Sequence, residues 1–261
     1  MNLPCRIAAV AGLAALCQVA AAETYYRWTD SDGSARFTRS QPGLGFAYEA
    51  FEVPDPVRWL NAPDMPAEIG TDAGPTPQSF FKSVSKSVYG LTGKMQDESG
   101  HARGVVFGSA VAITDKLALT NCHVLEGAGE DIYLGAGETG EVEKARLVGA
   151  NYEADRCVIS VSRMDLHPVP GVRRFDAVEV GESVYAIGNP LKLDRTLSEG
   201  LLSGKRTKGE QRYLQTTAPI SPGSSGGGLF DTRGNLIGIT SFTLRGAQSL
   251  NFAIPAEDYW K

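Results

Sequence analysis

The sequence has 261 residues, of which 42% are hydrophobic and 21% charged, and its formal net charge at pH 7 is -5. This composition is typical of a folded chain with one large domain or two compact ones. No basic stripe with interleaved aromatic residues is present, and the composition therefore argues against a nucleic-acid partner.

Residues 1–22 have the pattern of an export signal. Arg6 precedes an apolar run over residues 7–20, and small residues lead up to Ala22. This pattern predicts a signal peptide cleaved after Ala22, because the run is short for a membrane-spanning helix. A lipid anchor on Cys17 is disfavoured, since Leu16 stands where a small residue should precede the cysteine. We expect a periplasmic or secreted protein without a stable membrane span.

Residues 23–53 predict a small β-hairpin domain. Two aromatic, β-favouring stretches flank residues 30–33, which end in Asp32-Gly33, a strong hairpin signal. The Tyr26-Arg27-Trp28 core resembles a short hairpin domain of unknown function at the N-termini of bacterial envelope proteins, which implies an envelope partner. The alternative is a hairpin that only packs on the rest of the chain. Residues 54–77 carry six prolines and predict a semi-extended linker.

Residues 78–261 predict an all-β domain. Short β-favouring runs recur at 87–91, 104–113, 117–120, 131–134, 142–148, 157–161, 178–187, 212–217, 236–242 and 250–254. Glycine, proline and polar turns separate these runs, which favours a barrel or sandwich over alternating strands and helices.

Ser225 lies in a segment suited to an acyl-transfer nucleophile. Such a serine needs a tight turn with open backbone N–H groups, and Gly223, Gly226 and Gly227 allow one. The pattern also fits the nucleophile elbow of α/β-hydrolases, where a histidine follows the serine along the chain. The last histidine here is His167, so that order is excluded. The plain alternative is a flexible Gly-Ser turn.

His123 is the candidate base for Ser225. It follows the apolar run 117–120, whereas His101 and His167 lie in turn-like contexts. A lone histidine beside apolar residues is more often structural than catalytic. The presence of Ser225 in the same chain favours the catalytic interpretation of His123.

A triad also needs a buried carboxylate that fixes the histidine tautomer. Asp155 precedes the run 157–161 and completes the chain order His, Asp, Ser. Asp131 and Asp176 stand before other strands and remain the alternatives.

Five motifs resemble the HtrA (DegP-like) bacterial branch of the chymotrypsin-like serine proteases. They are Thr120-Asn121-Cys122-His123-Val124, Asp155 with the strand after it, Ala186-Ile187-Gly188-Asn189-Pro190, Pro222-Gly223-Ser224-Ser225-Gly226-Gly227 and Phe252-Ala253-Ile254-Pro255. The resemblance covers residues 79–255 and implies two β-barrels with a triad in the cleft between them. The sequence ends at Lys261, soon after the last motif, and we expect no PDZ domain.

The same resemblance implies roles for the candidate residues. His123, Asp155 and Ser225 would be catalytic, the N–H groups of Gly223 and Ser225 would form the oxyanion hole, and Ser241 would support Asp155. No metal or cofactor is implied.

The expected specificity depends on Pro219. In trypsin-like relatives an aspartate six residues before the nucleophile selects Arg or Lys, and here that position is Pro219, with the apolar Ile220 and Phe242 nearby. An uncharged pocket rejects a cation, because the desolvation of the cation goes uncompensated. We expect cleavage after small or medium apolar residues.

Two cysteines remain after the predicted signal peptide, Cys122 and Cys157. The resemblance brings their segments together through the His123–Asp155 hydrogen bond, and export permits oxidation, which implies a disulfide. Two buried thiols are the alternative. A zinc site lacks further ligands.

The sequence thus predicts an exported serine endopeptidase that acts on protein or peptide substrates. The alternative function is a catalytically weak protease-fold binding protein of the cell envelope, because a fold alone does not decide activity.

Overall fold

The computed structural model describes residues 23–29, 35–38, 48–53, 63–69, 75–96, 102–126, 128, 131–136, 140–189, 195–243 and 249–261. The predicted signal peptide, the predicted turn at residues 30–33 and His101 lie outside this set. None of the helices formed by the described residues has the length and apolar character needed to cross a membrane.

The N-terminal part forms a three-stranded antiparallel sheet. Its strands are β1 (Glu23–Thr29), β2 (Ala35–Thr38) and β3 (Tyr48–Val53), in the order β2-β1-β3. Tyr26 of β1 pairs with Thr38 on one side and with Ala50 on the other, so β1 is central. The third strand, β3, was not assigned from the sequence.

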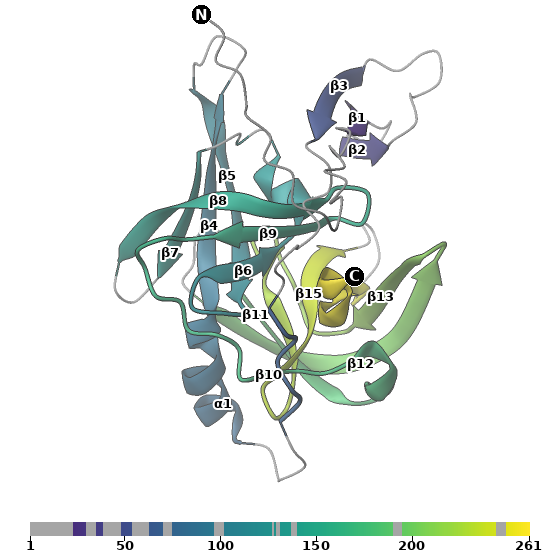
Figure 1. Ribbon diagram of the computed structural model, residues 1–261. Helices are drawn as coiled ribbons and strands as arrows, with labels where there is room; N and C mark the ends of the chain where they lie inside the picture. The colour runs from purple at the N-terminus through teal and green to yellow at the C-terminus, as the bar shows by residue number, and fades with distance from the viewer. Residues whose placement is uncertain are drawn as a thin grey trace, which may run out of the picture.

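The first barrel is a closed ring of six strands (Figure 1), in the order β4-β5-β6-β9-β8-β7. The strands are β4 (Val88–Gln96), β5 (Ala102–Ala112), β6 (Leu117–Thr120), β7 (Ile132–Ala136), β8 (Glu141–Asn151) and β9 (Arg156–Ser160). Alternate side chains such as Ala110 and Ala112 of β5 point inward, where Leu91, Leu134 and Ile159 fill the interior.

The second barrel is built from a seven-stranded sheet in the order β10-β15-β14-β11-β12-β13-β16, in which a β15–β16 pairing closes a ring of six strands and leaves β10 outside it, paired with β15. The strands are β10 (Gly171–Val172), β11 (Ser183–Gly188), β12 (Thr196–Lys208), β13 (Gln211–Thr216), β14 (Gly228–Asp231), β15 (Asn235–Thr243) and β16 (Asn251–Pro255). Its interior includes Val184, Leu202, Leu214 and Leu229. The prediction of an all-β, two-barrel fold is confirmed.

A third hydrophobic cluster joins the two barrels. It combines Val111 and Val158 of the first barrel with Ile187 and Phe230 of the second. These side chains are buried, so the barrels share a continuous apolar contact that fixes their relative position.

The helices are short, and none was predicted from the sequence. They are α1 (Pro77–Val84), η1 (Ser85–Ser87), η2 (Cys122–Leu125), η3 (Phe175–Ala177) and η5 (Ala256–Trp260). The side chain of Thr76 caps α1 by accepting from the Ser79 N–H, and Pro77 occupies the first turn. Phe80 and Val84 of α1 are buried in the cluster between the barrels.

Residues 63–69 have no helix or strand and are attached to the second barrel. The Trp260 indole N–H donates to the Pro63 carbonyl (2.9 Å), and the Ile69 N–H donates to the Asn235 side chain (2.7 Å). Glu68 forms an ion pair with Arg173. This strap therefore links the C-terminal η5 to β15.

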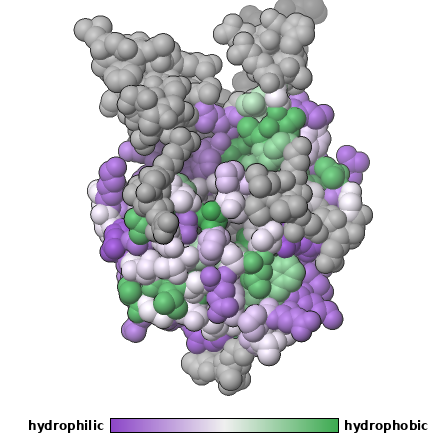
Figure 2. Space-filling view, turned by 180° about the vertical axis from the view of Figure 1, so that it is seen from behind, coloured by the Kyte–Doolittle hydropathy of each residue, from purple (hydrophilic) through white to green (hydrophobic). Residues whose placement is uncertain are grey.

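Seen from behind, the molecule carries separate hydrophobic patches between hydrophilic ones (Figure 2). The exposed large hydrophobic residues include Val105 of β5, Val142 of β8 and Leu201 of β12. Scattered residues of this kind are normal on folded proteins.

Candidate active site

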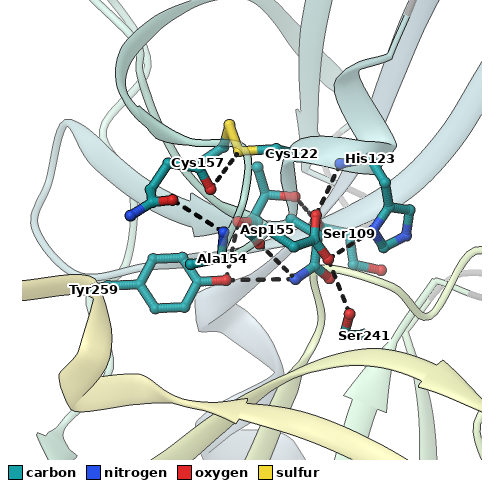
Figure 3. The surroundings of a disulfide bond; sticks show 11 residues. Ser109, Cys122, His123, Ala154, Asp155, Cys157, Ser241 and Tyr259 are labelled. Atoms are coloured by element: carbon teal, nitrogen blue, oxygen red, sulfur yellow. Dashed lines mark hydrogen bonds and ion pairs between the residues drawn. A yellow bond between two sulfur atoms is a disulfide. The ribbon is translucent and has the colours of Figure 1, made fainter. Parts of the chain in front are cut away.

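His123 and Asp155 meet at the end of the first barrel. His123 lies in η2, directly after β6, and Asp155 lies in the turn between β8 and β9. The His123 Nδ1 is 2.8 Å from Asp155 Oδ2, and the His123 backbone N–H donates to Asp155 Oδ1 at 2.9 Å. The Ser241 hydroxyl donates to Asp155 Oδ2 at 2.9 Å. Figure 3 shows Asp155 between His123 and Ser241.

The turn that carries Asp155 has an uncommon backbone conformation. Asp155 has φ +55°, in the left-handed region, which aspartate tolerates better than most residues other than glycine. The Asn151 side chain accepts from the Ala154 N–H (2.9 Å), and the Asp155 N–H donates to the Tyr152 carbonyl (3.2 Å). These bonds close the turn and direct the carboxylate of Asp155 toward His123.

Asp155 changes the protonation equilibrium of His123. Burial acts against the charged ring, but the charge of Asp155 and its hydrogen bond outweigh it and raise the pKa of His123 above 6.5. The Glu126 carboxylate adds to this effect. An imidazolium on His123 is therefore stabilised, which is the property needed of a base that takes a proton during a reaction.

The loop around Ser225 is tied to both barrels. Gly226 has φ +84°, and a Cβ there would lie 2.0 Å from the Ser109 carbonyl oxygen, so only glycine fits. The Ser109 N–H donates to the Ser225 carbonyl (2.8 Å), and the Ser109 hydroxyl donates to the Gly223 carbonyl (2.9 Å). The Gly226 N–H donates to the Thr240 carbonyl in β15.

The Ser225 hydroxyl donates to the Ser241 carbonyl oxygen at 2.9 Å rather than to the His123 ring. Ser241 therefore contacts both Asp155 and Ser225. A change of the Ser225 rotamer is needed before its hydroxyl can pair with His123, and catalytic contacts are often loose before a substrate binds.

Two backbone donors lie beside Ser225. Across the ranges that the structure describes, the N–H groups of Gly223 and Ser225 have no hydrogen-bond acceptor. Gly223 has φ +95°, a conformation that favours glycine. Two such donors on a fixed loop are suited to binding a developing oxyanion.

Cys122 and Cys157 form a disulfide next to this site, with a Cα–Cα distance of 4.9 Å (Figure 3). Cys122 is the first residue of η2 and its side chain is buried, whereas the His123 ring points toward Asp155. Adjacent residues thus face different ways, and the bond links the segment of His123 to the segment of Asp155.

The residues expected to shape the specificity pocket lie on the second barrel. Pro219 is exposed, Ile220 packs against the barrel core, and Phe242 is 41% exposed. The Phe242 ring stacks on Phe252 at 4.9 Å and meets Tyr213 edge to face. None of the three expected residues lines the cavity of about 310 Å³ that the structure describes over the first barrel, beside Phe107 and Tyr133.

The alternative candidates lie in other surroundings. The Tyr89 hydroxyl accepts from the His167 N–H at 2.8 Å, Asp131 forms an ion pair with Lys144, and Asp176 lies in η3. Within the described part of the chain, neither Asp131 nor Asp176 contacts His123.

Sequence reasoning missed two residues that contact the site, Asn121 and Tyr259. The Asn121 amide lies within hydrogen-bonding distance of the Asp155 carbonyl and the Tyr259 hydroxyl. Asn121 stands in the motif that contains His123, which was its only sequence signal, whereas Tyr259 lies after the last motif.

The comparison with protein families matches the central part of the chain. The family described as "Trypsin-like peptidase domain" matches residues 104–239, about half of the chain, including His123, Asp155 and Ser225.

Curated relatives are bacterial serine proteases. The chain is 38% identical over 156 residues to "Serine protease Do-like HtrB" of Bacillus subtilis, covering 54% of this chain and 33% of the relative. It is 34% identical to "Serine endoprotease DegS" of Haemophilus influenzae, covering 58% and 47%. It is 37% identical to "Probable periplasmic serine endoprotease DegP-like" of Pseudomonas savastanoi, covering 55% and 31%. The chain thus spans less than half the length of these relatives.

Solved structures of bacterial serine proteases are also similar to this chain. "HtrA-type protease AlgW with tripeptide" superimposes with a TM-score of 0.62 at 30% identity, covering 71% of this chain and 61% of that one. The serine endoprotease from Yersinia pestis gives a TM-score of 0.55 at 29% identity, covering 72% and 64%.

Proposed function

The chain belongs to the trypsin-like peptidase domain family, on its HtrA-type branch, and from this we propose that it is a serine endopeptidase with Ser225 as nucleophile, His123 as base and Asp155 as the supporting acid. The 2.8 Å contact between His123 Nδ1 and Asp155 Oδ2 is the observation that carries the proposal. It leaves Nε2 as the nitrogen that can accept the serine proton.

The proposed reaction is acyl transfer. After a rotamer change, Ser225 Oγ attacks the peptide carbonyl while His123 Nε2 takes the serine proton, and the N–H groups of Gly223 and Ser225 bind the oxyanion. The imidazolium then protonates the leaving amine, and water repeats the sequence on the acyl-enzyme to release the acid and restore Ser225. Asp155 keeps the proton on Nδ1 throughout.

Hydrolysis of an unfolded protein such as reduced casein tests this proposal. The purified chain should cleave it into peptides, and Ser225→Ala should abolish cleavage while keeping the melting temperature. Equal cleavage by the variant would mean that another group or a contaminant is responsible, and no cleavage by either protein would favour the binding-protein alternative.

We also propose an uncharged specificity pocket near Ile220 and Phe242, with cleavage after small or medium apolar residues. Both side chains are apolar, and no aspartate stands six residues before Ser225, where Pro219 lies. A substrate cation would therefore lose water without gaining a partner. A peptide library should give a profile dominated by apolar residues before the cleaved bond, and a profile dominated by Arg and Lys would contradict this.

We propose that the protein works in the periplasm or outside the cell after cleavage near Ala22. The sequence pattern of residues 1–22 supports this, as does the name of the Pseudomonas savastanoi relative, which describes a probable periplasmic endoprotease. N-terminal sequencing of the exported protein would locate the cleavage site.

A further inference from the structure

Asn121 is a buried polar residue at the centre of the site, between β6 and η2. Its side chain is fully buried, and its amide makes contacts to three separate parts of the chain. The Nδ2 donates to the Asp155 carbonyl oxygen at 3.2 Å and lies 3.5 Å from the Tyr259 hydroxyl. The Oδ1 accepts at 2.8 Å from the Gly226 N–H, a donor that it shares with the Thr240 carbonyl.

These contacts reach the acid and the nucleophile from one side chain. Gly226 directly follows Ser225 in the second barrel, and Asp155 belongs to the first. A shift of Asn121 therefore displaces the backbones of both residues at once. The catalytic geometry tolerates little displacement, because errors of about 1 Å can cost two orders of magnitude in rate.

Asp155 has a particular need for such a restraint. Its φ of +55° lies outside the conformations that a non-glycine residue prefers. Strained backbone of this kind persists only where surrounding contacts hold it, and Asn121 supplies the hydrogen bond to the Asp155 carbonyl. Without that donor, the part-buried carbonyl would lose its hydrogen bond to Asn121.

Tyr259 holds Asn121 in this orientation from the C-terminal η5. Its buried hydroxyl donates to the Thr120 carbonyl at 3.0 Å, which leaves its oxygen as the acceptor for Asn121 Nδ2. Burial raises the pKa of Tyr259 well above its ordinary value, so the hydroxyl keeps its proton and remains a donor. Figure 3 shows the Tyr259 hydroxyl directed toward the residues around Asp155.

We propose that Asn121 is a positioning residue that aligns Asp155 and the Ser225 loop across the two barrels, and that Tyr259 supports it. The rate effect rests on the proposed peptidase function, whereas the alignment of Asp155 with His123 does not. The Asn121 amide combines, on two separate atoms, a donor for the Asp155 carbonyl and an acceptor for the Gly226 N–H.

The test compares Asn121→Ala and Tyr259→Phe with Asn235→Ala. Asn235 of β15 is equally buried, but its side chain bonds to Asp231 of β14 and to Ile69 of the strap. Asn235→Ala therefore truncates a buried amide as Asn121→Ala does, at a different place. Each protein is assayed for kcat and KM on a peptide substrate and for melting temperature. The pKa of His123 is measured by NMR titration, assigned with His123→Ala.

Asn121→Ala should lower kcat by about 100-fold with little change in KM, because it disturbs alignment and not substrate binding. The pKa of His123 should fall toward 6.5, since Asp155 no longer holds the charged ring. Tyr259→Phe should also lower kcat and the pKa of His123, but by less than Asn121→Ala does. Asn235→Ala should lower the melting temperature and leave kcat and the pKa of His123 unchanged.

An unchanged pKa of His123 in folded Asn121→Ala would overturn the inference, as would a kcat loss no larger than that of Asn235→Ala. If Asn121→Ala does not fold, an unchanged pKa of His123 in Tyr259→Phe overturns the inference and a lowered one supports it. A wild-type protein without peptidase activity would refute the proposed function, while the pKa of His123 would still decide whether Asn121 aligns Asp155.

Discussion

Asp155 accepts hydrogen bonds from the His123 backbone and from the Ser241 hydroxyl, and its second oxygen also faces His123 Nδ1. A carboxylate held in this way has one orientation relative to the ring. The His123 tautomer and ring plane therefore depend on a single residue in a turn.

Asp155→Ala should lower kcat by roughly 10⁴-fold, because the ring loses both its fixed tautomer and its stabilised charge. The domain should remain folded. Asp176→Ala is the matched control, since Asp176 lies in η3, and its kcat should stay near the wild-type value. Retained activity in Asp155→Ala together with loss in Asp131→Ala or Asp176→Ala would show that the acid assignment is wrong.

The activity should depend on pH through His123. Its pKa lies above 6.5, and the ring must be neutral to act as a base, so kcat/KM should rise with pH to a half-maximum above 6.5. The stabilisation of the fold by the His123–Asp155 pair decreases with pH, whereas the rate increases. This stabilisation is fully present below pH 6.5 and is lost as the pH rises through the pKa of His123 in the folded protein. Rate profiles and thermal unfolding across this range measure the two effects, and a half-maximum below 6.5 would contradict the account.

For single residues, the sequence predicted that His123 and Asp155 lie next to each other, because both stand in motifs. It could not predict the Ser225 rotamer or the contacts of Asn121 and Tyr259. A rotamer depends on acceptors supplied by distant strands, here the Ser241 carbonyl of β15. Such contacts arise only when both barrels are assembled.

At the scale of elements, strands with clear apolar runs were predicted closely, and β6 (Leu117–Thr120) was predicted with its observed bounds. The longest strand of the second barrel, β12 (Thr196–Lys208), was missed. It contains Gly200 and Gly204 and ends in Lys-Arg-Thr-Lys, and only two of its residues are buried, so its composition resembles a loop. Pairing with β11 and β13 makes it a strand.

Helix α1 was missed because it directly follows the proline-rich segment.

The disulfide between Cys122 and Cys157 connects η2 to β9, and the two cysteines are 35 residues apart in the sequence. Closing a loop of this length should stabilise the fold by about 2–4 kcal/mol. The double variant Cys122→Ala with Cys157→Ala should therefore unfold at lower denaturant concentration than the oxidised protein.

The matched measurement is unfolding of the wild-type protein with and without reductant, with intact mass after alkylation under non-reducing conditions. Two alkylated cysteines in the folded, exported protein would refute the bond. A mass lower by two hydrogens without alkylation would support it.

At the scale of the whole molecule, the site depends on contacts between the barrels. The Ser225 loop belongs to the second barrel but is bonded to Ser109 of β5, and the apolar cluster with Phe80 fixes the two barrels against each other. The strap of residues 63–69 and η5 connect the chain before α1 to the last residues. The all-β class was predictable from strand spacing, and the two barrels from the resemblance that the motifs carry, whereas these tertiary contacts were not, because each joins residues far apart in the sequence.

Reaction with a fluorophosphonate probe tests whether Ser225 is an activated nucleophile, because the probe modifies a serine only when its hydroxyl is activated. We expect one adduct per chain, mapped to Ser225 by peptide mass spectrometry, with no adduct in Ser225→Ala and strongly reduced labelling in His123→Ala. An unlabelled wild-type protein, or an adduct on another residue, would contradict the assignment of Ser225 as the nucleophile.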